Sequence, residues 1–440
     1  MSQMMDLFGI DNVKFLGSEE RMDEDREYGL YKFEYDGGLP ECCPKCDGKV
    51  YRHGNRKINL IATPIQGRPA EYEIVFPRFR CKVCGCTFSP EIEGTADGRR
   101  CTDNAFNDIA QKSLTRPFED VARDYPTTPN TIKNIFLDFF NEYEEVLRFR
   151  TPAFLGLDEI NLGRKGMVTV VTDIEHGTLF DILPQRNQTA LTEYFSQLDE
   201  PERVLWVCTD MYRPFKKSLE SCFPNAQWVI DHFHVVAYAN RALDDLRKKY
   251  QATLSDKERI HVKKGLAYVL KTRVRDLKPE DAELLRMIRQ SNPEHPLIVA
   301  FDLKEDFFNI WDDNPTSKEN AMRAFDSWEA SIPDNPWFET FRGLAKTVHN
   351  FHTEIFRAWD CPTAITNGFT EAINGLIRHQ DSGGRGYSFD ILRLKMLYRR
   401  TNLKRVLASG SIKTGFYGTP IDKVSASSID PDEITSDDYF

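Results

Sequence analysis

The segments AFLGLDEI (residues 153–160) and VLWVCTDM (204–211) decide the fold of the central part of this chain. Each is a continuous apolar run, which is typical of a β-strand covered on both faces of its sheet. Each run also carries one aspartate, Asp158 or Asp210, and a buried carboxylate is costly unless a cation or a donor compensates it. Glu371 follows far downstream, in a segment with helical spacing (365–378). Together these three carboxylates predict a metal site.

The helix expected over 365–378 has two faces. Its polar side carries Asn367, Glu371, Asn374 and Arg378, and its apolar side carries Phe369, Ile373, Leu376 and Ile377. We expect the apolar side to pack on the sheet, so that Glu371 points at the two aspartates. Carboxylate oxygens suit Mg²⁺ or Mn²⁺. Two such ions can activate an attacking water or hydroxyl and stabilise a leaving oxygen, which indicates phosphodiester chemistry.

The segment 153–236 alternates strands and helices in the order strand, strand, strand, helix, strand, helix, strand. This is the order of an RNase H-like sheet, in which Asp158 lies on the first strand and Asp210 ends the fourth, its neighbour. The last strand is expected in AQWVIDHFHVV (226–236). Residues 240–360 are mostly helical and charged, with Trp328, Trp337 and Trp359 among their apolar anchors.

Two C-x-x-C pairs, CPKC (43–46) and CKVC (81–84), are separated by 34 residues. Four thiolates from two such pairs make the tetrahedral ligand set of a structural zinc site, here Cys43, Cys46, Cys81 and Cys84. Cys42 directly precedes the first pair and Cys86 follows the second by two positions, so the register of the ligands is open at each end. The alternative is four reduced cysteines without a metal.

A helix-turn-helix is expected next. RPFEDVARDY (116–125) predicts a short helix, and Thr128 followed by Pro129 predicts the start of a longer one with apolar residues on one face. The start of the second helix is where such motifs contact base edges. The candidate DNA contacts there are Asn130, Thr131, Lys133 and Asn134. An ordinary helical hairpin is the alternative.

The formal net charge of −10 is concentrated at the ends, since residues 1–36 hold ten acids against four bases and 419–440 hold six against one. Within the body, 241–280 and 376–405 are basic, which fits a polyanionic partner as well as a solvated helix face. No apolar run approaches membrane-spanning length. Ten cysteines without an evident export signal predict reduced thiols and a cytoplasmic location.

The residues resemble the ISL3 family of bacterial insertion-sequence transposases over nearly the whole chain. The most specific blocks are DHFHVV (231–236), TNGFTEAINGLIR (366–378) and GGRGYSF (383–389). The resemblance implies a DDE transposase that cuts and joins DNA at the ends of its own element. It places the catalytic triad on Asp158, Asp210 and Glu371. The helical stretch between the last two resembles the insertion domain that several DDE families have there.

Further roles follow from the same resemblance. Asp231 and His234 resemble a D-x-x-H element that positions DNA or supports the site, although a structural histidine pair at a strand end is the alternative. One of the three tryptophans named above stacks on a flipped base or, more commonly, packs in the core. Arg378 and Arg385, in the basic stretch 376–405, are expected DNA contacts. Transposases of this kind are often basic, and the acidic ends lie outside the pattern.

The expected architecture is α/β and multidomain. It comprises an acidic N-terminal extension (1–39), a zinc-ribbon module (40–100), a helix-turn-helix domain (101–150), an RNase H-like core in two parts (151–240 and 361–408) interrupted by a helical insertion domain (241–360), and an acidic tail (409–440). The expected function is recognition of terminal inverted repeats, metal-dependent cleavage with two Mg²⁺ or Mn²⁺, and strand transfer into target DNA by at least a dimer. The alternatives are a domesticated DNA-binding regulator and a structure-selective nuclease.

Overall fold

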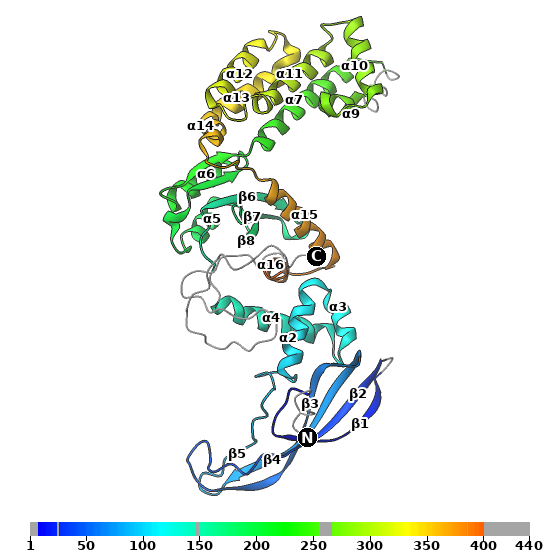
Figure 1. Ribbon diagram of the computed structural model, residues 1–440, viewed down its shortest axis with the longest axis vertical. Helices are drawn as coiled ribbons and strands as arrows, with labels where there is room; N and C mark the ends of the chain where they lie inside the picture. The colour runs from blue at the N-terminus through cyan, green and yellow to red at the C-terminus, as the bar shows by residue number, and fades with distance from the viewer. Residues whose placement is uncertain (1–7, 24–25, 147–148, 256–265, 385, 400–440) are drawn as a thin grey trace. The chain divides into compact units, whose positions relative to one another are not determined.

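The computed structural model of the chain describes residues 8–23, 26–146, 149–255, 266–384 and 386–399 (Figure 1). The chain divides into two compact units, Met1–Phe149 with Gln380–Phe440, and Arg150–His379. Each unit contains a mixed β-sheet and several helices, which confirms the α/β class. The expected tail over 409–440 lies outside the described residues.

The sheet of the first unit includes the N-terminal residues expected to form an acidic extension. Its strands are β1 (Val13–Asp23), β2 (Arg26–Tyr35), β3 (Val50–Ile65), β4 (Arg68–Cys81) and β5 (Thr87–Phe88). They lie in the order β1-β2-β4-β3, with β5 beside β4. Phe33 of β2 and Tyr72 of β4 are buried together, with ring centroids 5.0 Å apart. Residues 13–23 and 26–35 therefore belong to the sheet and its core, not to a separate extension.

Helices follow the sheet in the first unit: α2 (Asp103–Thr115), α3 (Phe118–Val121) and α4 (Pro129–Val146), joined much later by α16 (Phe389–Leu397). Thr102 caps α2 by accepting from the backbone N–H of Ala105. The short helix expected over 116–125 is only one turn of α-helix, α3, continued by a turn of 3₁₀-helix (Ala122–Asp124). The longer helix begins at Pro129, as expected.

The ammonium group of Lys395 joins α16 to the end of α2. It is fully buried and donates hydrogen bonds to the carbonyl oxygens of Ser113 and, at 3.0 Å, Arg116. The ring centroids of Phe118 and Tyr387 lie 4.6 and 4.7 Å from its nitrogen. Carbonyl groups at a helix C-terminus lack intrahelical partners, so a buried cation is satisfied there.

The second unit is built on a five-stranded sheet of β6 (Phe154–Asn161), β7 (Met167–Asp173), β8 (Thr178–Leu183), β9 (Trp206–Thr209) and β10 (Gln227–Ile230). Helices α5 (Gln188–Phe195) and α6 (Arg213–Cys222) connect the later strands. The order in the sheet is β10-β9-β6-β7-β8. The first and fourth strands of this unit are therefore neighbours, as the order of strands and helices predicted. β6 pairs antiparallel with β7 and parallel with β9.

The chain turns helical earlier than expected after the last strand. β10 ends at Ile230, and α7 (His232–Ala252) begins directly after Asp231, whose side chain accepts from the backbone N–H of Phe233. The prediction of a strand through 236 is wrong because this aspartate caps a helix. The helices that follow are α9 (Ala267–Lys271), α10 (Pro279–Ser291), α11 (Pro296–Asp312), α12 (Lys318–Ser331), α13 (Glu339–Asn350) and α14 (His352–Phe356).

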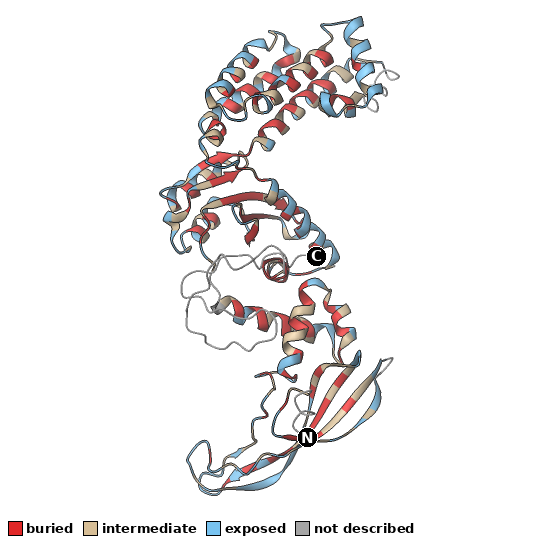
Figure 2. Cartoon of the chain, viewed as in Figure 1, coloured by how far each residue is buried: buried red, intermediate tan, exposed pale blue. Residues whose placement is uncertain are grey.

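Buried residues follow the facing sides of α7, α11 and α13 (Figure 2). Trp328 of α12 belongs to this core, because it is 3% exposed and donates its indole N–H to the Leu303 carbonyl oxygen. The Trp359 indole donates to the Asn314 carbonyl oxygen, and Trp337 is half-buried. Among the residues that the structure describes, none of the helices is both long enough and apolar enough to span a bilayer.

The environment of Lys395 predicts a pH-dependent stability. Burial lowers the pKa of this lysine from 10.5 to about 7. Between these values the unfolded chain holds a proton that the folded chain lacks, so the folded state gains stability as the pH rises from 7 to 10. Relative to Lys395→Met, the wild type should gain up to about 1.4 kcal/mol per pH unit in this window. Urea unfolding from pH 7 to 10 measures this difference. Lys14→Met, at an exposed strand position, should retain the wild-type slope, and parallel curves for wild type and Lys395→Met would contradict the prediction.

Candidate functional site

The register of three parallel strands determines where three aspartates lie. β6 and β9 pair through Gly156 and Cys208, and Asp158 and Asp210 each come two residues later. β9 and β10 pair up to their last residues, and Asp210 and Asp231 come directly after them. Side chains two residues apart point to the same face of a sheet. The register therefore brings Asp158, Asp210 and Asp231 to the same edge of the sheet, where the charge of Asp158 acts on Asp210.

The first two aspartates have raised pKa values. Burial raises the pKa of Asp158, against the opposing effects of the Glu159 backbone N–H, 2.8 Å from Oδ1, and of His234. Burial likewise raises the pKa of Asp210, which accepts from the Tyr212 backbone N–H at 3.0 Å, and the charge of Asp158 raises it further. Two carboxylates that are each held partly desolvated by the fold are stabilised by a positive charge placed between them.

Glu371 lies on α15 (Gly368–Gly383), close to the end of β10. One carboxylate oxygen of Glu371, one of Asp231 and one ring nitrogen of His234 all lie within 4.8 Å of one another. His234 also interacts electrostatically with Asp158 and Asp210. The structure therefore brings the five residues predicted as triad and support to one region, with Asp231 and His234 at its centre.

A chain of buried hydrogen bonds attaches α15 to the sheet. Asn367 donates to the Leu157 carbonyl oxygen at 2.8 Å, and Thr370 donates to Asn367 at 2.9 Å. The hydroxyl groups of Thr370 and Thr172 are 2.7 Å apart, and Asn374 donates to Oδ2 of Asp158 at 2.6 Å. The side chains in this series of hydrogen bonds are buried, with Asn367, Thr370, Thr172 and Asn374 each 3% exposed or less. Helix α15 is thus fixed by polar side chains that the strands satisfy.

The expected orientation of this helix is partly wrong. Ile373 and Ile377 are buried, as expected of the apolar side, but Leu376 is 41% exposed. Asn367 and Asn374, assigned to the open polar side, are buried. Burying a polar group costs less when it is hydrogen-bonded, as the amide nitrogens of both residues are. The partners of these amides lie more than 200 residues away in the sequence, so the apolar pattern alone could not show the buried side.

Gly156 allows the close approach of α15 to β6. A Cβ atom at this position would lie 2.5 Å from the hydroxyl oxygens of Thr172 and Thr370 and 2.7 Å from Oδ1 of Asn367. These distances are far below normal van der Waals contact, and the three atoms belong to the hydrogen-bond chain described above. A side chain at position 156 would therefore separate the helix from the strand that carries Asp158.

A cluster of charged and aromatic side chains beside Asp210 was not predicted from the sequence. Arg186 donates to Glu159 at 2.6 Å, and its guanidinium lies 5.2 Å from the centre of the Tyr212 ring. Both Arg186 and Glu159 interact electrostatically with Asp210. The available signal was the charge of Glu159 within an apolar run; nothing in the loop sequence marked Arg186. The arrangement holds a half-exposed cation next to the carboxylates.

The residues expected to contact DNA are dispersed. Asn130 is exposed, and Thr131, Lys133 and Asn134 are half-buried, all in the first two turns of α4. Arg378 is on the exposed side of α15, in the second unit. Arg385 lies outside the described residues.

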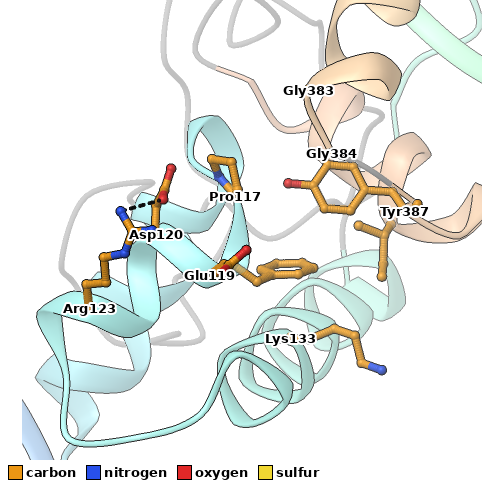
Figure 3. A pocket seen from close by; sticks show the side chains of 11 residues that line it. Pro117, Glu119, Asp120, Arg123, Lys133, Gly383, Gly384 and Tyr387 are labelled. Carbon is orange, nitrogen blue, oxygen red and sulfur yellow. Dashed lines mark ion pairs between the residues drawn. The ribbon is translucent and has the colours of Figure 1, made fainter. Parts of the chain in front are cut away.

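Lys133 also lines a cavity of about 450 Å³ in the first unit (Figure 3). Its walls come from α3, from the end of α15 and from the turn before α16, including Pro117, Arg123, Gly383 and Tyr387. Arg123 pairs with Asp120 at 3.2 Å, and Glu119 adds a second acid. Charges of both signs meet in this cavity, so its lining does not favour one kind of ion.

The four predicted cysteine ligands converge in the first unit. The sulfur atoms of Cys43, Cys46, Cys81 and Cys84 all lie within 4.8 Å of one another. The pairs Cys46–Cys81 and Cys43–Cys84 are 3.5 and 3.7 Å apart, close to the ~3.8 Å between sulfurs that a tetrahedral zinc site with Zn–S bonds of about 2.3 Å requires. Cys86 is also near, 3.2 Å from Cys43.

Backbone geometry supports thiolates at this cysteine cluster. The N–H groups of Val83 and Cys84 donate to the Cys81 sulfur at 3.3 and 3.4 Å. The pKa of the Cys84 thiol is lowered to about 6, chiefly because the backbone N–H of Cys86 donates to its sulfur. Against the effect of the Gly48 backbone N–H, by contrast, the neighbouring sulfurs of Cys84 and Cys81 raise the pKa of Cys46 to about 12. Anionic sulfurs at this spacing are able to hold a metal ion.

The known proteins to which this chain is similar are transposases. The family model described as a transposase, of the ISL3 group of DDE transposases, matches residues 155–396. The transposase for insertion sequence element IS1001 of Bordetella parapertussis is 25% identical over 347 residues, covering 74% of this chain and 82% of that protein. The transposase for insertion sequence element IS1557 of Mycobacterium tuberculosis is 26% identical over 256 residues, 52% of this chain and 56% of its own length.

The packing at Gly156 predicts a specific loss of stability. Gly156→Ala should destabilise the second unit by about 1–3 kcal/mol, because the added methyl group has no space between β6 and α15. Gly343→Ala is the matched control, since a Cβ there meets nothing within 4 Å in an exposed helix position. It should be neutral or stabilising by about 0.5–1 kcal/mol. Thermal unfolding of both variants measures the difference, and equal stabilities would contradict the proposed close approach.

Proposed function

This chain belongs to the ISL3 family of transposases, and we propose that it excises and inserts an insertion sequence by metal-dependent DNA cleavage and strand transfer. In this proposal Asp158, Asp210 and Glu371 are the catalytic carboxylates. The family match over 155–396 carries the proposal, because this range includes all three carboxylates and the strands that align the first two.

The sheet of the second unit supports an RNase H-like core. Its first three strands are antiparallel neighbours, and the fourth and fifth are added in parallel next to the first. Asp158 lies on the first strand and Asp210 directly follows the adjacent fourth strand. Helix α15, which comes after all five strands in the sequence, adds Glu371. The helices between β10 and α15 then constitute an insertion into this core.

The donor set fits Mg²⁺ or Mn²⁺. Bound divalent ions would polarise the scissile phosphodiester and the attacking oxygen. The chain itself supplies two features, an oriented carboxylate and a guanidinium. Asn374 and the Glu159 backbone N–H fix the orientation of the Asp158 carboxylate. Arg186, held by Glu159 and Tyr212, places a guanidinium where a phosphate of the DNA strand could accept from it.

The first unit is proposed to recognise the terminal inverted repeats. The cysteine cluster would hold a structural zinc ion, since four sulfur ligands leave no open position for chemistry. Helices α2, α3 and α4 would act as the helix-turn-helix, with the exposed start of α4 toward DNA. Synapsis of two element ends implies at least two copies of the chain on DNA.

The carboxylate assignment predicts the loss of chemistry without loss of DNA binding. Asp158→Asn, Asp210→Asn and Glu371→Gln should each reduce cleavage about 10³-fold or more, because an amide oxygen does not supply the charge that holds the ions. Binding to a duplex ending in the inverted repeat that flanks the coding region should be unchanged in a gel-shift assay. Glu193→Gln, an exposed acid on α5, should cleave like wild type. Efficient cutting by any of the three variants would remove that residue from the triad.

The cysteine geometry predicts one zinc ion per chain. Cys81→Ser should lose the ion and the ability to bind the inverted repeat, as atomic absorption and gel shift would show. Cys42→Ser should retain both, because its sulfur lies outside the group of four. Cys86→Ser tests the register: retained zinc supports Cys84 as the fourth ligand, and zinc loss in Cys86→Ser with retention in Cys84→Ser would assign that position to Cys86.

A further inference from the structure

Two buried polar atoms without hydrogen-bond partners among the described residues, one on Asp231 and one on His234, lie close to the exposed carboxylate of Glu371. Asp231 is fully buried; its Oδ1 accepts from the Phe233 backbone N–H at 3.2 Å, and its Oδ2 has no hydrogen-bond partner among the described residues. Nε2 of His234, in the first turn of α7, is also buried and unpaired within that part of the chain. Glu371 approaches both from α15.

Leaving these groups unpaired would be costly. A buried carboxylate oxygen without a donor loses its hydration without replacement, which costs more than a buried neutral group. The charged groups that face His234 are the carboxylates of Asp158 and Asp210, and the nearest ring nitrogen to Asp231 on its own turn, Nδ1 of His232, is 3.6 Å from Oδ1. A cation coordinated by Asp231 and His234 would supply the partner that each of these two buried atoms lacks, and the exposed Glu371 carboxylate lies close enough to complete the ligand set.

A similar group of residues at similar spacing does not by itself leave buried ligand atoms without hydrogen-bond partners. Asp173, Glu175 and His176 have the same composition and also lie within 4.8 Å of one another. There, however, Asp173 is already satisfied, because Oδ1 accepts from the His176 backbone N–H at 3.2 Å and Oδ2 pairs with its Nδ1 at 2.7 Å. Only the first of these two groups offers buried, unpartnered ligand atoms, and the second provides a control.

We propose that Asp231, His234 and Glu371 form a mixed oxygen and nitrogen site for a divalent transition-metal ion, typified by Mn²⁺. The inference rests on the proposed function in one respect: Glu371 would be shared between this ion and the catalytic carboxylates. Mg²⁺ takes oxygen ligands almost exclusively, whereas Mn²⁺ is a transition metal that shares this preference for carboxylates but tolerates an imidazole ligand better. The site therefore sets a preference of this enzyme for Mn²⁺ over Mg²⁺, with His234 as the discriminating ligand.

The test is Mn²⁺ binding by the full-length, zinc-loaded protein in the absence of DNA. Free Mn²⁺ is followed by electron paramagnetic resonance, and nitrogen coordination by electron spin-echo modulation of the bound ion. Wild type should show a ¹⁴N coupling that His234→Gln loses, together with an affinity reduced about tenfold or more. His176→Gln, the matched control, should retain both, and thermal melting shows whether each variant is folded.

The outcomes separate this inference from the proposed function. Unchanged Mn²⁺ affinity in folded His234→Gln, or no ¹⁴N coupling in wild type, would overturn the site even if the enzyme cleaves DNA. Asp231→Asn should weaken Mn²⁺ binding as well, since it removes the charge of the second ligand; full binding by this variant would also overturn the site. Conversely, loss of the ¹⁴N coupling in His234→Gln alongside full cleavage by Asp158→Asn would support the site and contradict the catalytic assignment.

Discussion

The attachment of α15 to β6 through buried polar groups is the constraint on which the second unit depends. Asn367, Thr370 and Asn374 reach the strand only because Gly156 leaves room for them, and Asn374 ends this chain on the carboxylate of Asp158. Helix α15 also carries Glu371, so one contact fixes both the third acid and the orientation of the first. The amide nitrogens of Asn367 and Asn374 are satisfied in this network, and Oδ1 of Asn374 is its one buried atom without a partner among the described residues. The position of the carboxylates is therefore set by hydrogen bonding more than by apolar packing.

Much of the fold was predictable from the sequence, because its signals were local. The apolar runs around Asp158 and Asp210 predicted the two strands, the order of strands and helices over 153–236 predicted their adjacency, and paired C-x-x-C spacing predicted the four sulfurs. The buried side of α15 was not predictable, because the partners of its amides are over 200 residues away. The same holds for Arg186, whose position beside Asp210 follows from the folding of a loop. Asp231 was predicted within a strand, yet a single side-chain to backbone bond makes it a helix cap.

The acidic N-terminal residues show that charge composition alone does not predict whether a segment belongs to an ordered sheet. Residues 1–36 hold ten acids, and the sequence predicted an acidic N-terminal extension over 1–39. In the structure, Glu19 pairs with Lys32 on the neighbouring strand at 2.6 Å, and Glu20 pairs with Arg68 at 2.8 Å. Such exposed pairs contribute little stability. They do, however, allow an acidic strand to lie on an ordered sheet, whose other side is closed by the aromatic core around Phe33 and Tyr72.

The position of α16 has a consequence for the synthesis of the protein. Its Lys395 completes the core formed by α2, α3 and α4, yet it is translated about 250 residues after α4, which at about 5–20 residues per second is a delay of tens of seconds. Until then, Phe118 and Phe136 lack the side chain that covers them. The unit that begins the chain is therefore among the last to be completed on the ribosome. A prematurely terminated product that retains the cysteines and α2–α4 would still lack part of its core, so truncated chains should compete poorly with complete ones for the same DNA.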